Sequence, residues 1–208
     1  MHRGLPTGVY TGHGTTPQQP RQHRVDPPRG GTGTRRTGAT IVPLSAPEKD
    51  AAQVLAQEWR EFDSRGALPV DPIKIARSLG IEVYAAVLSA GLSGMVVGTP
   101  NAEPVIYLNE RDSATRQLFT CAHEIGHYLS RAAAGDDQFT FRDRRDELSS
   151  EGTDPDERYA NGFAAALLMP AEIVKREVRN VSNPALLAAK FGVSAQAMTI
   201  RLSALGLR

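Results

Sequence analysis

The pentapeptide His123-Glu124-Ile125-Gly126-His127 constrains the fold of this chain more than any other segment. Two histidines four residues apart lie one above the other on a single face when the backbone between them is helical. In that geometry both imidazoles can bind one zinc ion, with Glu124 beside them as a base for a water molecule. The pentapeptide therefore predicts a helix that carries a metal site.

The distribution of histidine supports this interpretation. The chain has five histidines, and the three outside the pentapeptide all lie in a leader rich in glycine, proline and threonine. Leu118, Ala122, Ile125 and Leu129 repeat at helical spacing, so we expect one face of the helix to be apolar and buried. The alternative, a solvated helix with two incidental histidines, would not require such a face.

Composition divides the chain into a leader and a body. Residues 1–46 contain six arginines, one acid and eight glycines, and we predict that this leader is disordered because it cannot bury enough apolar surface. The body is mildly acidic, which gives no general signal for nucleic-acid binding.

Cys121 is the one cysteine and suits a reducing compartment. With no membrane span and no signal peptide in the sequence, we expect a cytoplasmic protein.

Hydrophobic periodicity predicts an α+β arrangement in the body. Helices are expected at 48–64, 71–80, 112–131 and 154–170. Strands are expected at 81–85, 92–97 and 105–108. We expect the last two strands to form an antiparallel hairpin and the polar segment 135–154 to be a loop. Two or three short helices are expected over 171–208, which separates a domain at 47–170 from a helical subdomain at 171–208.

Two histidines need a third protein ligand to form a catalytic zinc site. No histidine is left in the body, so the ligand must be a carboxylate or, less favourably, Cys121, which lies on a different helical face from His123. Glu157 is favoured because it opens the next helix on the side that continues as an apolar stripe. Asn161 lies one turn further on and could orient the carboxylate of Glu157.

Other interpretations of this region remain open. Asp154-x-x-Glu157 is similar to a capping box, in which Glu157 would only satisfy backbone donors at the start of the helix. Glu151, Asp154 and Asp156 are alternative ligands. The charged run at 141–150 is either a contact for a substrate or, as is commoner for such runs, a solvated loop.

These residues predict hydrolysis of an amide. Zinc held by His123, His127 and Glu157 would lower the pKa of a water molecule toward about 7 and polarise a carbonyl. Glu124, which is not a ligand, would take the proton of the water and pass it to the leaving amine. The candidates for an oxyanion-stabilising group are Tyr107, Arg116, Tyr128 and Tyr159. The strand at 105–108 could pair with an extended substrate if it lies at the edge of the sheet.

Two blocks of sequence resemble the ImmA/IrrE family of zinc metallopeptidases. The first, 116–129, contains the pentapeptide, and the second, 157–170, is similar to that family's E-x-x-A-N-x-F-A-A-x-L-L-M-P stretch. The segments 72–80 and 94–109 also fit. The resemblance covers roughly residues 68–208 and rests on two distant motifs that agree.

The resemblance implies a zincin-like α+β fold, in which a small three-stranded sheet packs on helices, and it makes Glu157 the third ligand of Zn²⁺. It also implies an endopeptidase that cleaves a helix-turn-helix repressor encoded nearby, during a stress response or the induction of a mobile element. Many such proteins resemble toxin–antitoxin partners. Tyr159 departs from the family's pattern, in which an acid is common, and we do not expect this difference to affect the metal.

The tail at 187–202 itself resembles a helix-turn-helix, with a turn at Gly192. A recognition helix should be basic and polar, but this one carries Arg201 as its one cation, with Gln196 and Thr199 as possible base readers. We therefore expect a helical subdomain that packs on the peptidase.

Two other classes of function remain as alternatives. One is a DNA-binding transcriptional regulator that acts through residues 180–208, with a structural or sensing metal site. The other is a pseudo-enzyme that senses zinc or holds a partner. The intact Glu124 disfavours the second, because a structural metal site does not need that residue.

Overall fold

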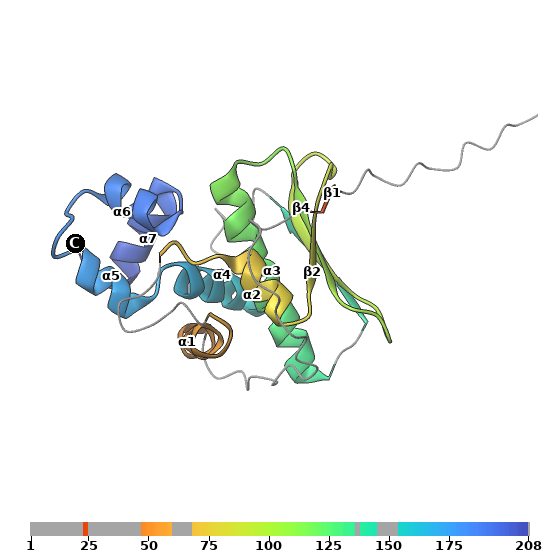
Figure 1. Cartoon of the computed structure of the whole chain (residues 1–208). Coiled ribbons are helices and arrows are strands. Elements are labelled where there is room, and N and C mark those ends of the chain that lie inside the picture. The colour runs from red at the N-terminus through yellow and green to blue at the C-terminus, as the bar shows by residue number, and fades with distance from the viewer. Residues whose placement is uncertain (1–22, 25–46, 60–67, 136–137, 145–153, 208) are drawn as a thin grey trace, which may run out of the picture.

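In the computed structural model, helices lie along one face of a small mixed sheet (Figure 1). The structure describes residues 23–24, 47–59, 68–135, 138–144 and 154–207. The helices in these ranges are α1 (Pro47–Glu58), α2 (Pro72–Ser78), α3 (Ala114–Ala134), α4 (Pro155–Leu168), α5 (Ala171–Glu177), α6 (Pro184–Phe191) and α7 (Ala195–Ala204). The strands are β1 (His23–Arg24), β2 (Glu82–Ala86), β3 (Leu92–Gly98), β4 (Val105–Asn109) and β5 (Phe139–Arg144). The α+β class is confirmed.

The helices begin and end at the residues that local chemistry favours. Asp71 and Ser113 cap α2 and α3, because their side-chain oxygens accept hydrogen bonds from backbone N–H groups of the first turn. Pro72 and Pro155 open α2 and α4, where no backbone donor is needed. The helix α3 ends at Gly135, whose φ of 73° lies in the left-handed region. The helix expected at 48–64 ends at Glu58, and residues 60–64 of that range lie outside the described residues.

The sheet has the strand order β1-β2-β4-β3-β5, with β2 and β4 parallel and the other neighbours antiparallel. The expected hairpin of β3 and β4 is confirmed. Two further strands, β5 and the two-residue β1, extend the three that were expected. The prediction of a loop throughout 135–154 was wrong, because β5 lies within it. The strand β1 falls in the leader, and the rest of the prediction of disorder for 1–46 lies outside the described residues.

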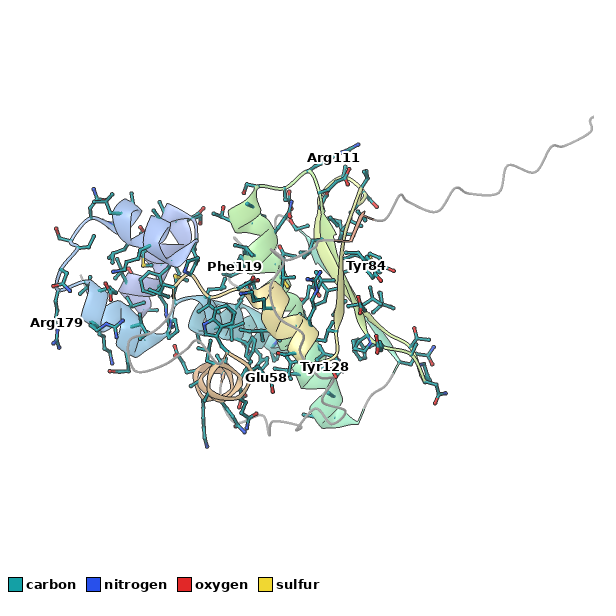
Figure 2. All side chains as sticks on the ribbon, in the orientation of Figure 1. Glu58, Tyr84, Arg111, Phe119, Tyr128 and Arg179 are labelled. Carbon is teal, nitrogen blue, oxygen red and sulfur yellow. The ribbon has the colours of Figure 1, made fainter. Side chains whose placement is uncertain are left out.

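The two faces of the sheet have different surroundings. Val83, Ile106 and Val96 are paired across β2, β4 and β3, and all three are fully buried beneath the helices. Tyr84 and Tyr107 occupy the alternate positions, and Figure 2 shows Tyr84 on the side of the sheet that faces away from the helices. Because β4 lies between β2 and β3, it is an inner strand, and the condition for pairing with an extended substrate is not met there.

The long helix α3 is sandwiched between the sheet and α4. It contacts β3, β4 and β5 on one side and α4 on the other, and α1 packs against α4 from outside (Figure 1). The backbones of α3 and α4 meet where Gly126 faces Ala160: a Cβ atom at Gly126 would lie 3.0 Å from the Cα of Ala160. A larger residue at either position would separate the two helices.

Three short helices complete the chain, as expected for 171–208. The one cation of α7, Arg201, is buried, with 5% of its surface exposed. Its Nε donates to the carbonyl of Met169 at 2.9 Å, and its Nη2 donates to Glu48 at 3.1 Å. In this conformation Arg201 cannot reach a DNA groove, so the regulator alternative loses its candidate cation. Across the described residues, no helix is long and apolar enough to span a bilayer.

Candidate metal centre

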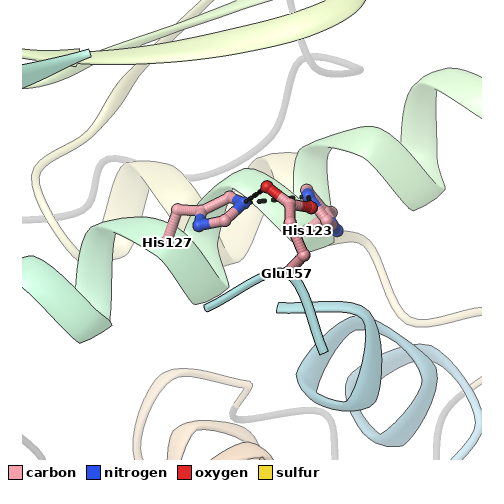
Figure 3. Close-up of side chains that lie close together, drawn as sticks. All are labelled: His123, His127 and Glu157. Atoms are coloured by element: carbon pink, nitrogen blue, oxygen red, sulfur yellow. Dashed lines mark hydrogen bonds and ion pairs between the residues drawn. The ribbon is translucent and has the colours of Figure 1, made fainter. Parts of the chain in front are cut away.

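The two histidines of the pentapeptide lie on the face of α3 that meets α4. Both are 1% exposed, so their imidazoles are removed from solvent. Glu157 lies in the first turn of α4 and directs its carboxylate between the two rings (Figure 3). Among the described residues, these three form the group whose donor atoms lie close enough to hold one metal ion.

The distances within this group fit a metal ion. The Nε2 atoms of His123 and His127 are 3.0 Å apart. The carboxylate oxygens of Glu157 lie 3.3 Å from Nε2 of His123 and 3.1 Å from Nε2 of His127. Ligands bound to zinc at about 2.0–2.2 Å in a tetrahedral arrangement are separated from one another by about 3.3 Å. Two imidazoles and a carboxylate are also the donor types that zinc takes in catalytic sites.

Asn161 orients a histidine rather than the carboxylate. Its Oδ1 lies 3.1 Å from Nδ1 of His123, where the ring N–H can donate to it. A proton on Nδ1 leaves the lone pair of Nε2 directed at the metal position, and such an outer contact fixes the ring and its tautomer. The expectation that Asn161 would orient Glu157 was therefore wrong, although the residue does support the site.

Replacing Asn161 by alanine is expected to weaken zinc binding by about tenfold to a hundredfold, because the imidazole of His123 loses the acceptor that fixes its ring. Competition with a chromogenic chelator would measure the change. Asn161→Asp keeps an acceptor oxygen and should retain most of the affinity. Equal affinities in wild type and Asn161→Ala would contradict the role assigned to this contact.

The electrostatics favour the protonation states that bind a metal. The close imidazoles of His123 and His127 hold the pKa of Glu157 below its usual range, so the carboxylate is ionised at neutral pH. Burial lowers the pKa of His127, so this imidazole is neutral there. An ionised carboxylate and a neutral imidazole are the forms that act as ligands.

Glu124 is fully buried and lies on the face of α3 that packs against β3. A Cβ atom at Gly94 of β3 would lie 3.5 Å from Oε1 of Glu124, which locates the carboxylate at the contact between helix and strand. Glu124 is adjacent in sequence to His123 but is not one of the three clustered donors. Its role as the base that acts on the water stays a prediction from the pentapeptide.

The alternative ligands have other contacts. Asp154 caps α4 by accepting a hydrogen bond from the N–H of Asp156 at 3.0 Å, while the carboxylate of Asp156 pairs with Arg131 at 2.7 Å. Cys121 is buried in the core, and burial raises the pKa of its thiol. Glu151 lies outside the described residues. The capping interpretation of Glu157 is not supported, because its two oxygens face the histidines.

The structure shows contacts for each of the four oxyanion candidates. Tyr107 lies in the register row of Tyr84, on the sheet face away from α3. The other contacts are Arg116 Nε to Ser93 Oγ at 3.1 Å, Tyr128 to Phe139 with ring centroids 6.4 Å apart, and Tyr159 OH to Asp50 Oδ2 at 2.9 Å. The first four residues of the charged run, 141–144, belong to β5. Residues 145–150 lie outside the described residues.

One family model matches the part of the chain that contains the site. The model of the Peptidase M78 family, described as the IrrE N-terminal-like domain, matches residues 76–203. This range contains α3 and α4 with all three clustered donors, whereas α1 precedes it. No curated protein matches the chain.

Proposed function

Because the chain belongs to the Peptidase M78 family, with its IrrE N-terminal-like domain, we propose that it is a zinc-dependent endopeptidase. The observation that carries this proposal is the convergence of His123, His127 and Glu157, whose donor atoms come from two helices and lie at the mutual distances of zinc ligands. Zinc is the proposed ion because two imidazoles and one glutamate are the protein ligands of one class of catalytic zinc sites in peptidases.

The chain's own residues can perform peptide hydrolysis around such an ion. Zinc bound there would lower the pKa of a water molecule toward about 7 and polarise the substrate carbonyl. Glu124 accepts a proton from the attacking water and later donates it to the leaving amine. Asn161 keeps His123 in one tautomer. Because the histidines and Glu124 are buried, their charges and dipoles act in a medium of low dielectric, where they are strongest.

We further propose that an extended substrate segment pairs with β5 rather than β4. Among the described strands β5 is the last in the order of the sheet, and it contacts the helix that carries the histidines. An edge strand offers unpaired backbone donors and acceptors, which bind a peptide without demanding particular side chains.

The proposed substrate is a helix-turn-helix repressor encoded near this chain, an assignment that rests on the resemblance to ImmA/IrrE proteins. The test is incubation of the purified, zinc-loaded chain with each regulator encoded beside it. We expect one discrete cut in one regulator, and we expect a chelator to abolish it. A repressor from an unrelated locus serves as the control. If the zinc-loaded chain cleaves none of the neighbouring regulators, the substrate assignment is wrong.

A further inference from the structure

We propose that α1 is a positioning element for the metal site, which holds α4, and with it Glu157, through the hydrogen bond between Tyr159 and Asp50. The inference rests on the proposed binding of zinc. It concerns a helix that lies before the range matched by the family, 76–203, and a contact between Asp50 and Tyr159 that the sequence did not predict.

The helix α4 presents two opposite faces to its neighbours. Glu157 and Asn161 are four residues apart and both contact the histidines of α3. Tyr159 follows Glu157 by two residues, which is roughly 200° around a helix. On that second face α1 approaches closely, since a Cβ atom at Gly162 would lie 3.0 Å from Cγ of Pro47. The first helix therefore backs α4 from the side opposite the metal.

The contact between these helices includes a buried carboxylate. Asp50 is 1% exposed, and its Oδ2 accepts the hydrogen bond of the Tyr159 hydroxyl at 2.9 Å. Its Oδ1 is buried and, within the described part of the chain, has no hydrogen-bond partner. Burying a carboxylate with one hydrogen bond costs free energy that an apolar residue would not cost. Asp50 lies in the first turn of α1, where the helix dipole favours an acid, but the dipole does not require the bond to Tyr159, which fixes how α4 sits on α1.

A second contact from α1 reaches the other end of α4. Glu48 binds Arg201, and the same guanidinium donates to the carbonyl of Met169, the residue that caps the C-terminus of α4. With Tyr159 held near the beginning of α4 and Met169 near its end, α4 is restrained against both sliding and tilting.

Glu157 is the ligand most dependent on this restraint. Its side chain is 22% exposed, whereas those of His123 and His127 are 1% and 2% exposed. The contacts that the structure shows for its carboxylate are with the two histidines. Because the surroundings of the side chain do not fix it, the placement of α4 decides where its oxygens lie relative to the metal position.

The experiment compares three variants of the full chain: Tyr159→Phe, Asp50→Asn and Val54→Ala. Zinc affinity is measured by chelator competition, the coordination sphere by the visible spectrum of the cobalt-substituted protein, and stability by the melting temperature of the metal-free chain. Tyr159→Phe removes the donor and should weaken zinc binding by about tenfold, the lower end of the effect of outer contacts. It should also change the cobalt spectrum.

The other two variants separate positioning from stability. Asp50→Asn keeps an acceptor for the Tyr159 hydroxyl and should bind zinc within about twofold of wild type. Val54, fully buried on α1, takes no part in the hydrogen bond, so Val54→Ala should lower the melting temperature by several degrees yet leave zinc affinity and the cobalt spectrum unchanged.

The proposal is overturned if Tyr159→Phe keeps wild-type zinc affinity and an unchanged cobalt spectrum. It is equally overturned if Val54→Ala loses as much affinity as Tyr159→Phe, because general stability would then account for both. A wild-type chain that binds no zinc would contradict the metal site and this inference together. Since binding is measured rather than cleavage, absence of peptidase activity would contradict the proposed function alone.

Discussion

Replacing Glu124 by glutamine is expected to slow peptide-bond hydrolysis by about a hundredfold to ten-thousandfold, while zinc binding stays intact. Glutamine preserves the size of the side chain and its buried packing but cannot accept a proton from the attacking water. Glu124 is fully buried on α3 and stands outside the cluster of three donors, so the substitution removes a base and not a ligand.

Single-turnover cleavage of the repressor would measure this effect, together with the zinc content of each preparation. Glu110→Gln is the matched control, because it makes the same chemical change at an exposed position before α3. It should cleave at the wild-type rate. A Glu124→Gln protein that loaded zinc and cleaved as fast as wild type would show that the hydrolytic base is elsewhere.

Replacing Glu157 by alanine is expected to reduce zinc affinity by at least about a hundredfold, because two histidines alone do not complete a catalytic site. Activity should fall in parallel at limiting zinc. The start of α4 should survive, since Asp154 supplies its cap and Pro155 its first residue. The loss should therefore appear in metal content more than in melting temperature.

Metal analysis after dialysis against a weak chelator would measure this loss. Glu172→Ala on α5 is the control, since the side chain of Glu172 is 83% exposed and pairs with Lys175, away from the site. It should retain one zinc per chain. Stoichiometric zinc in Glu157→Ala would contradict the ligand assignment and return the alternatives near α4 to consideration.

Much of the fold was predictable because its signals are local. Asp71-Pro72 and Asp154-Pro155 are helix starts that depend on a few adjacent residues, and both begin helices at the expected positions. The apolar runs of β2, β3 and β4 likewise identified strands within one or two residues. In each case the backbone preference and the burial pattern agree.

The strand β5, which was not predicted, shows where inference from neighbouring residues fails. Phe139-Thr140-Phe141-Arg142 alternates apolar and polar residues, which is the period of a half-buried strand. The charged residues after it suggested a loop, although charges are common on edge strands. The order of strands was not predictable either, because the parallel pairing of β2 with β4 depends on contacts distant in sequence.

The site was predictable to the extent that its residues are neighbours on one helix. His123 and His127 follow from a spacing of four, whereas the place of Glu157 required two helices to pack at Gly126 and Ala160. The same packing brought Asn161 to His123 instead of Glu157. Tyr159 and Asp50 are 109 residues apart, and no periodicity links positions at that distance.

The division of the ligands between α3 and α4 has a consequence for the lifetime of the protein. An ion bound by ligands from both helices would link them, so the chain would have to release the ion in order to unfold. Free zinc at a hundred times its dissociation constant would add about 2.7 kcal/mol to the free energy of unfolding. A shortage of the ion would thus lower the folded fraction of the chain as well as its proposed activity.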